Sequence, residues 1–383
     1  MTDYGRSNIA AFYLDPSVLH LNHGAYGAVP RRVMAALQHY QTEAEARCST
    51  FFRDRYDPML TERLDLVARR YGGQGCEWVF VENATAACNA IFLSCRLEAG
   101  DEILFTSAIY GAVRNALLHW QGTRGITLTE LPMRLPVEDP AQVVDLVRAA
   151  LSPKVKLLVI DHVTSTSALR LPVGEIAALC RESSTRVLVD GAHGPGQIAL
   201  DVPALGVDYY TGNAHKWHFA PKGCAMLWVR PGLGGTVHPT VISHGYRTGL
   251  HGEFNWIGTR DASAWFAFRD AVEAHDGFGG KALMRRNRDL AAEAGACLAE
   301  ALGTVVAGPP EMQVAMSTIL LPVKADATAS ERIQRDFSTH YAMETSFVPW
   351  EDRLAIRISA QVYNELEDYE TLVTALKDYF DLS

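Results

Sequence analysis

Residues 185–196 read TRVLVDGAHGPG, a short apolar stretch that ends at Asp190 and continues into a glycine-rich segment. A strand that is apolar throughout is typical of a parallel sheet buried on both faces. Ligands bind to such sheets beyond the carboxyl ends of the strands. We therefore expect Asp190 to lie at a ligand-binding edge of the sheet, with a turn or helix-capping role as the alternative.

The segments around this strand alternate between strand-like and helix-like patterns. Strands are expected over 77–83, 102–107, 125–131, 155–163 and 185–193, and helices over 30–48, 58–71, 84–97, 111–121, 141–151 and 173–183. A further strand, with an antiparallel direction as one option, is expected over 224–230. The alternation predicts an α/β fold in which helices cover both faces of a mostly parallel sheet.

The pattern changes after a glycine-rich segment, HDGFGGKA, at 275–282. A long helix follows, and then strands and helices that predict a small α+β domain. We predict an N-terminal arm over 1–30, a large cofactor-binding domain over 31–280 and a small C-terminal domain over 281–383.

The composition argues against several classes of partner. The 383 residues carry a net charge of −9, and no run of basic residues is longer than RR, so no nucleic-acid partner is expected. No signal peptide and no stretch of 18 uncharged apolar residues is found, so no membrane partner is expected either. The seven cysteines are scattered without a Cys-x-x-Cys pair, which is typical of reduced thiols in a cytoplasmic protein.

Residues 211–223, TGNAHKWHFAPKG, surround Lys216 with aromatic side chains. Because burying an ammonium is costly, this lysine either completes the packing or acts as a neutral amine. It follows the strand-end Asp190 by 26 residues (216 − 190). Pyridoxal phosphate enzymes use such a pair: the lysine binds the cofactor aldehyde, and the aspartate keeps the ring nitrogen protonated. The nearby ring cation then disfavours the ammonium form of the lysine.

Residues 81–91, VENATAACNAI, predict a helix that begins at Asn83, Ala84 and Thr85. The free N–H groups of a helix start form an anion site, to which the Thr85 hydroxyl can add a hydrogen bond. An ordinary helix cap is the alternative. No G-x-G-x-x-G or Walker pattern is present, so a nucleotide phosphate is not the expected anion.

The stretch 189–223 resembles the cofactor core of fold-type I pyridoxal phosphate enzymes of the class V aminotransferase-like superfamily. Four further segments are similar to its isopenicillin N epimerase-like branch, which also contains cysteine C–S lyases: LNHGAYGAVPRRV (21–33), HVTSTSALRLPV (162–173), GTRDASAW (258–265) and IRISAQVYN (356–364).

The resemblance implies a role for each matching residue. Lys216 forms the Schiff base with the cofactor, and Asp190 pairs with its pyridine nitrogen. Tyr110 stacks on the cofactor ring. The other implied cofactor contacts are Ala84, Thr85, Asn213 and His215 at the phosphate, His193 near the phenolic oxygen, and Thr164, with Ser165 as the alternative, at the rim.

The resemblance also implies substrate contacts and a partner. Arg357, on a C-terminal strand, offers a planar fork to the α-carboxylate, with a structural salt bridge as the alternative. Asn22 and His23 are further expected substrate contacts, although His23 has a structural role as its alternative. Relatives are homodimers with shared active sites, in which Thr259 would reach the phosphate bound by the other chain.

No metal site is expected, because His215 and His218 have no third ligand nearby.

The fold alone does not select the reaction. We predict a C–S β-lyase that cleaves an S-conjugated cysteine, with residues 246–256 contacting an extended substrate and 47–56 capping the pocket. The alternatives are an amino-acid epimerase with Tyr110 as proton donor, a decarboxylating or oxidative deamination, and a class V aminotransferase. A cysteine desulfurase would need a mobile late cysteine, and Cys297 lies in an expected helix. A non-enzymatic relative would be expected to lose Lys216 or Asp190.

Overall fold

The computed structural model describes residues 4–324 and 327–382. Its main feature is a seven-stranded sheet with the order β2-β8-β7-β6-β5-β3-β4. The strands are β2 (Trp78–Val81), β3 (Glu102–Thr106), β4 (Thr127–Leu131), β5 (Val155–Asp161), β6 (Arg186–Asp190), β7 (Tyr209–Asn213) and β8 (Ala225–Val229). Only β8 pairs in the antiparallel direction, with β2 and β7. The α/β fold with a mostly parallel sheet is therefore confirmed, as is the antiparallel option for β8.

One strand of this sheet differs from the prediction. Strand β7 occupies residues directly before the lysine segment, where no strand was expected, and it pairs with β6 and β8. Its sequence, YYTGN, lacks the apolar run of its neighbours, yet all five residues are buried. Backbone pairing with β6 and β8 on its two edges, and packing of Tyr209 and Tyr210 into the cores on its two faces, explain this strand.

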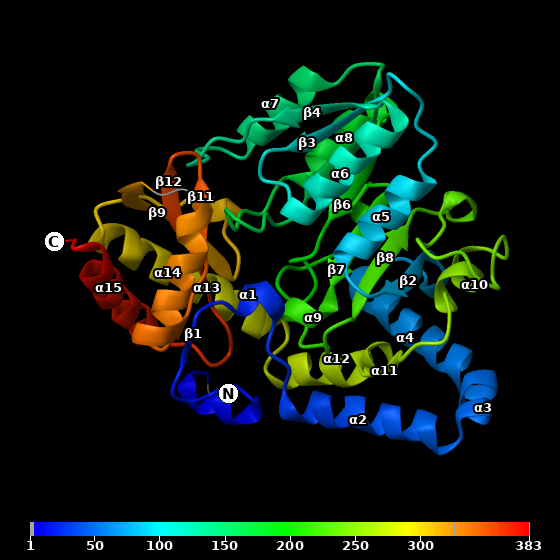
Figure 1. Ribbon diagram of the computed structural model, residues 1–383, viewed down its shortest axis with the longest axis horizontal. Helices are drawn as coiled ribbons and strands as arrows, with labels where there is room; N and C mark the ends of the chain where they lie inside the picture. The colour runs from blue at the N-terminus through cyan, green and yellow to red at the C-terminus, as the bar shows by residue number, and fades with distance from the viewer. Residues whose placement is uncertain (1–3, 325–326, 383) are drawn as a thin grey trace.

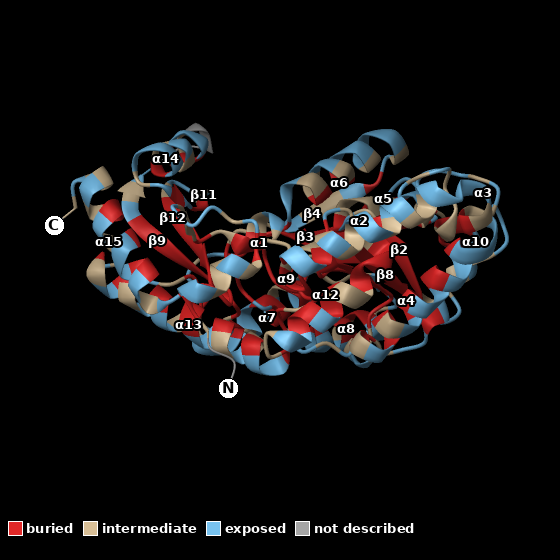
Figure 2. Ribbon diagram, turned by 90° about the horizontal axis from the view of Figure 1, so that it is seen from below, coloured by how far each residue is buried: buried red, intermediate tan, exposed pale blue. Residues whose placement is uncertain are grey.

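Helices cover both faces of the sheet (Figures 1 and 2). Alternate residues of each strand contribute to different cores: Leu158 and Ile160 of β5 pack on one side, and Leu157 and Val159 on the other. The first core includes α4 (Tyr56–Tyr71), α7 (Ala141–Ala150) and α8 (Val173–Glu182). The second includes α5 (Ala84–Ser94), α6 (Gly111–Arg124) and α10 (Leu250–Asn255).

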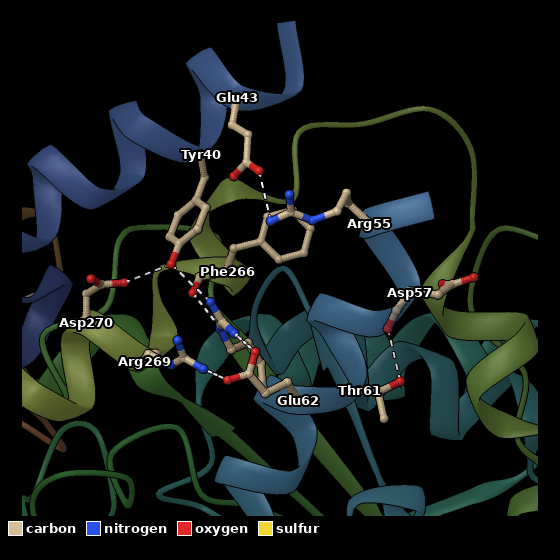
Figure 3. Close-up of polar contacts among 10 residues, drawn as sticks. Tyr40, Glu43, Arg55, Asp57, Thr61, Glu62, Phe266, Arg269 and Asp270 are labelled. Atoms are coloured by element: carbon tan, nitrogen blue, oxygen red, sulfur yellow. Dashed lines mark hydrogen bonds and ion pairs between the residues drawn. The ribbon is translucent and has the colours of Figure 1, made fainter. Parts of the chain in front are cut away.

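A polar cluster holds the outer helices together (Figure 3). The Arg63 side chain of α4 is only 3% exposed and donates to the Phe266 carbonyl at 2.9 Å and to the Tyr40 hydroxyl at 3.0 Å. These partners belong to α11 (Ser263–Phe266) and α2 (Arg31–Ala46), and α12 (Phe268–Gly277) follows α11 directly in the chain.

The segment 47–56 comprises α3 (Cys48–Thr50), a π-helix (Phe51–Arg55) and the start of α4.

A smaller antiparallel sheet has the order β11-β12-β9, with β9 (Met316–Lys324), β11 (Phe347–Trp350) and β12 (Arg353–Ser359). Helices α13 (Lys281–Ala301), α14 (Ala327–His340) and α15 (Leu366–Phe380) accompany it. In the N-terminal arm, β1 (Leu19–His20) pairs with β10 (Met343–Glu344). The arm continues into α1 (His23–Tyr26), which lies beside α9 (Ala214–Trp217) between the two sheets (Figure 1). The domain boundaries at 30 and 280 remain a prediction.

All seven cysteines are free thiols, and four of them are buried. Within the described residues, no helix is both long enough and apolar enough to span a bilayer.

Candidate active site

A cavity of about 410 Å³ lies at the carboxyl ends of the parallel strands. Its walls are formed by Ala25, Tyr26, Asn83, Ala84, Thr85, Tyr110, Asp161, Ser165, Asp190, Ala192, His193, Asn213, His215 and Lys216. These residues come from loops after β2, β3, β5, β6 and β7 and from the N-terminal arm. The structure thus brings together every residue predicted to contact the cofactor, except Thr164 and Thr259.

Two glycines allow the chain to approach the lysine segment closely. A Cβ on Gly27 would lie 2.2 Å from the His215 carbonyl oxygen, and a Cβ on Gly196 would lie 2.6 Å from the backbone nitrogen of His218. Both have positive φ, +71° and +80°. Only glycine both lacks a Cβ and readily adopts a positive φ. Gly27 and Gly196 therefore allow the GAYG and GPG segments to pack closely against the lysine segment.

The Lys216 amine contacts a histidine whose protonation the structure defines. Lys216 Nζ lies 3.0 Å from His193 Nε2, and the Trp217 indole N–H donates to His193 Nδ1 at 3.2 Å. Since an indole can only donate, His193 Nδ1 carries no proton. Burial lowers the pKa of His193 well below its ordinary value, so the ring is neutral with its proton on Nε2. That proton can be donated to Lys216 only when the lysine is a neutral amine, so the contact favours the neutral form. Trp217 thus does more than complete the packing.

We expect Lys216 to react as an amine at unusually low pH. Burial, followed by the charge of Arg357, lowers its pKa to about 8, although Asp190 and Asp161 oppose the shift. In cofactor-free protein, the labelling rate of Lys216 by an amine reagent, followed by peptide mass spectrometry, should rise as the pH increases and level off above about 8. Asp190→Asn removes an opposing negative charge, so the midpoint should fall further. A midpoint near the ordinary value of 10.5 would contradict this assignment.

Two carboxylates lie side by side at the end of the sheet. Asp190 of β6 is in register with Asp161 of β5, and each is 2% exposed. Asp190 accepts the Ala192 N–H at 2.9 Å, whereas Asp161 Oδ2 has no hydrogen-bond partner in the described chain. Burial and the neighbouring Asp190 charge raise the pKa of Asp161 well above its ordinary value. The pair therefore holds its proton mainly on Asp161 and its negative charge on Asp190, where it can face a ring nitrogen.

The start of α5 forms the opposite end of the cavity. Asn83 caps the helix, because its Oδ1 accepts the Ala86 N–H at 2.9 Å. Asn213 Oδ1 accepts the Ala84 N–H, also at 2.9 Å. The Ala84 amide is therefore already paired, although Ala84 itself lines the cavity and its place at the phosphate stays a prediction. The Thr85 hydroxyl and the Asn213 NH₂ group remain as donors.

His215 could contribute a further donor only after protonation. Its Nδ1–H donates to the Cys224 carbonyl at 3.1 Å, so Nε2 is unprotonated in the neutral ring. Burial lowers the pKa of His215 to about 4. A phosphate dianion beside the ring would raise this pKa, and the predicted contact depends on that change.

Arg357 lies beside the cavity without an acidic partner. It is 5% exposed and donates to the Ser165 carbonyl at 2.5 Å and to Asn22 Oδ1 at 2.9 Å. Its Nε has no partner, and none of the ion pairs among the described residues includes it. The alternative of a structural salt bridge is therefore not observed. A buried cation without a counter-charge favours an anionic ligand, and Asn22 orients the guanidinium.

Thr164 and His23, which were predicted to contact the cofactor and the substrate, form hydrogen bonds within the protein. The Thr164 hydroxyl is completely buried; it lies 2.7 Å from the Ser167 hydroxyl and accepts the Leu169 N–H at 2.9 Å. The prediction of Thr164 at the rim is therefore wrong, and Ser165 lines the cavity. The His23 ring nitrogens contact the Tyr363 hydroxyl at 2.9 Å and the Lys216 carbonyl at 3.1 Å. This favours the structural alternative for His23.

Three other parts of the chain that were expected at the active site do not line the cavity of their own chain. Thr259 is exposed, and neither segment 47–56 nor segment 246–256 lines the cavity. The latter packs against the β2 edge, where His251 Nε2 donates to the Trp78 carbonyl at 2.9 Å. Within one chain, residues 246–256 therefore do not contact a substrate in this cavity.

Sequence reasoning missed Asp161 and Tyr26. Asp161 ends the run LLVID in the same way that Asp190 ends VLVD, so the pattern that identified Asp190 could have found it. Tyr26 lines the cavity with its side chain 77% exposed, and no sequence signal distinguished it.

The arrangement fits pyridoxal phosphate. A neutral lysine amine is available for the aldehyde, a buried carboxylate for the ring nitrogen, and uncommitted donors at the start of α5 for the phosphate. No cluster of three metal-ligating side chains occurs in the described ranges.

Comparisons with known proteins agree with this site. The aminotransferase class-V family matches residues 20–372. The chain is 32% identical over 400 residues to putative L-cysteine desulfhydrase 1 of Oryza sativa subsp. japonica, covering 94% of this chain and 83% of that protein. It is 30% identical over 387 residues to isopenicillin N epimerase of Streptomyces clavuligerus, covering 95% of each.

A solved structure of a C-DES mutant, with glycine covalently linked to its PLP cofactor, shares the fold. Its TM-score is 0.80 at 20% identity, over 94% of this chain and 96% of that one. The chain therefore belongs to the class V aminotransferase family of fold-type I enzymes, and its cofactor is pyridoxal phosphate.

Proposed function

We propose that this enzyme is a C–S β-lyase that acts on L-cysteine or an S-conjugated cysteine. The substrate and one water would yield a thiol (hydrogen sulfide from cysteine itself), pyruvate and ammonia. Elimination needs a base for the Cα proton and a leaving group at Cβ. The similarity to an L-cysteine desulfhydrase supports this reaction class.

The surroundings of Tyr110 favour elimination over epimerisation. An epimerase needs a second proton donor on the face opposite Lys216, and Tyr110 was the candidate. Its side chain is 46% exposed, and its hydroxyl has no hydrogen-bond partner among the described residues. Solvent can exchange its proton, but no described side chain hydrogen-bonds this hydroxyl to orient it, whereas His193 Nε2 lies 3.0 Å from Lys216 Nζ.

Each active-site residue has a separate role in the proposed elimination. Bound pyridoxal phosphate supplies a sink for the electrons released when a bond at Cα breaks. Arg357 holds the α-carboxylate, Lys216 accepts the Cα proton, and Asp190 keeps its negative charge at the ring nitrogen. No cysteine lines the cavity, which argues against a persulfide-forming desulfurase.

Product analysis in deuterated water tests the proposal. L-Cysteine and S-alkyl cysteines should yield thiol and pyruvate, and Tyr110→Phe should retain this elimination. Intact amino acid with scrambled configuration and deuterium at Cα, lost in Tyr110→Phe, would instead establish the epimerase reading. That alternative has its own support in the 30% identity to isopenicillin N epimerase.

Arg357→Lys should raise KM steeply while the visible absorbance of the bound cofactor stays unchanged. A lysine cannot offer two parallel N–H groups to a carboxylate, and removing such a buried contact costs on the order of 2–5 kcal/mol in kcat/KM. Arg286→Lys is the matched control, because Arg286 is a partly buried arginine that donates to the Gln361 carbonyl at 2.7 Å, whereas Arg357 donates to Ser165 of the cavity wall. Unaltered kinetics in Arg357→Lys would assign Arg357 a purely structural role.

We further propose a cytoplasmic homodimer in which Thr259 completes the phosphate site of the other chain. Thr259 is exposed in one chain, and the cavity mouth carries the exposed Tyr26 and Tyr110. Native mass spectrometry of the holoenzyme should give a dimer, and Thr259→Ala should weaken cofactor binding in that dimer. An active monomer would refute this arrangement.

A further inference from the structure

A second cavity, of about 380 Å³, is separate from the active site. It lies where the first two turns of α13 meet the loops after β5 and β6. Its polar lining residues include Arg170, Gln197, Lys281, Arg285, Arg288 and Glu311, and none of its lining residues is shared with the active-site cavity. We refer to it as the α13 groove.

The α13 groove concentrates positive charge on an acidic protein. Lys281, Arg285 and Arg288 are spaced i, i+4 and i+7, so they share one face of α13. Like charges at this spacing repel each other. The first turn of α13 contains no acidic residue, and the helix dipole makes this end positive as well. This charge pattern is unfavourable for an isolated helix and would be relieved by a bound anion.

Most of these cations have no counter-charge within the chain. Arg288 pairs with its neighbour Asp289 at 2.7 Å. The ion pairs of the described residues include none for Arg170, Lys281 or Arg285, and Glu311 is the single carboxylate of the groove. The net charge of the whole chain is −9, so this local excess is not a general property of the surface.

Besides these cations, the α13 groove has a buried hydrogen-bond acceptor on Gln197. It is 4% exposed, and its NH₂ group donates to the His193 carbonyl at 2.7 Å. Because that carbonyl can only accept, the orientation of the amide is defined, and Oε1 is left buried without a partner. A buried acceptor without a donor costs free energy, and an O–H or N–H group of a ligand that reached it from the groove would recover that cost.

We propose that the α13 groove binds a small organic polyanion that also carries a hydrogen-bond donor, of the hydroxy-polycarboxylate type. The carboxylates would lie among Arg170, Lys281 and Arg285, and the donor would reach Gln197 Oε1. This proposal does not depend on the reaction catalysed in the active site.

Isothermal titration calorimetry of the holoenzyme at low ionic strength tests the proposal with two probes. Citrate has three carboxylates and a hydroxyl, and tricarballylate has the same carboxylates without the hydroxyl. We expect citrate to bind at least about threefold more tightly, as one hydrogen bond to a buried acceptor predicts. The double variant Lys281→Gln/Arg285→Gln should weaken citrate binding by about tenfold or more, since two exposed charges are removed.

Matched variants locate the binding. Arg335→Gln removes an exposed arginine of α14, outside the groove, and should leave citrate affinity unchanged. Arg357→Lys should also leave it unchanged; a loss there would place the anion in the active site and overturn the proposal. Wild-type affinity in the double variant, or no binding of millimolar citrate, would overturn it as well. Equal affinities for the two probes would refute the role of Gln197.

Discussion

Lys216→Ala is expected to abolish both the visible absorbance of the bound cofactor and turnover. The neutral amine of Lys216, 3.0 Å from His193 Nε2, is the nucleophile available to the cofactor aldehyde and the base available to the Cα proton. Losing both roles should reduce kcat by at least on the order of 10⁴-fold. Absorbance spectra and steady-state kinetics of purified wild type and variant measure the two effects.

Lys222→Ala is the control for this experiment. Lys222 is an exposed lysine of the same segment, and it donates to the Gly27 carbonyl at 2.5 Å. It does not line the active-site cavity, so its removal should retain the visible band. A Lys216→Ala protein that keeps both absorbance and activity would show that another group binds the cofactor.

Asp190→Asn should retain bound cofactor but lose most of its activity. An amide can still accept the Ala192 N–H, so the loop geometry should persist. It cannot stabilise a protonated ring nitrogen as a carboxylate does, which should raise the barrier by about 3–4 kcal/mol, or several hundredfold in kcat. In cofactor-free protein the substitution removes a buried charge that faces no ring nitrogen, so the free energy of unfolding of that form should not fall.

Asp161→Asn provides a matched comparison on the neighbouring strand. Asp161 is equally buried and in register with Asp190, but it holds the proton of the pair. Its replacement by a neutral amide should therefore cost much less activity. A larger loss in Asp161→Asn than in Asp190→Asn would reverse the two roles.

Much of the fold followed from local sequence patterns. Apolar runs such as LLVI in β5 and VLV in β6 are typical of strands buried on both faces, and each follows a helical segment. These patterns are independent of distant contacts, so the parallel sheet and its ligand-binding edge could be predicted. Lys216 and Asp190 were identified together, because a lysine among aromatic residues, 26 residues after a strand-end aspartate, matches the pair that pyridoxal phosphate enzymes use. Asp190 alone kept a turn or helix-capping role as its alternative.

Tertiary contacts decided what local patterns could not. Strand β7 exists because its two edges pair with β6 and β8, and Asn213 pairs with the Ala84 amide across 129 residues of chain. Thr164 and Ser165 are adjacent and chemically alike, and only the direction of each side chain separates a buried hydroxyl from a cavity wall. The sequence by itself therefore placed Asp190 and the start of the helix at 83–85 at the sheet edge, since the ends of parallel strands share one edge, and the family resemblance added Lys216, Asn213 and His215. Which of their atoms remain free to bind a ligand depended on hydrogen bonds between distant segments, which only the folded chain brings together.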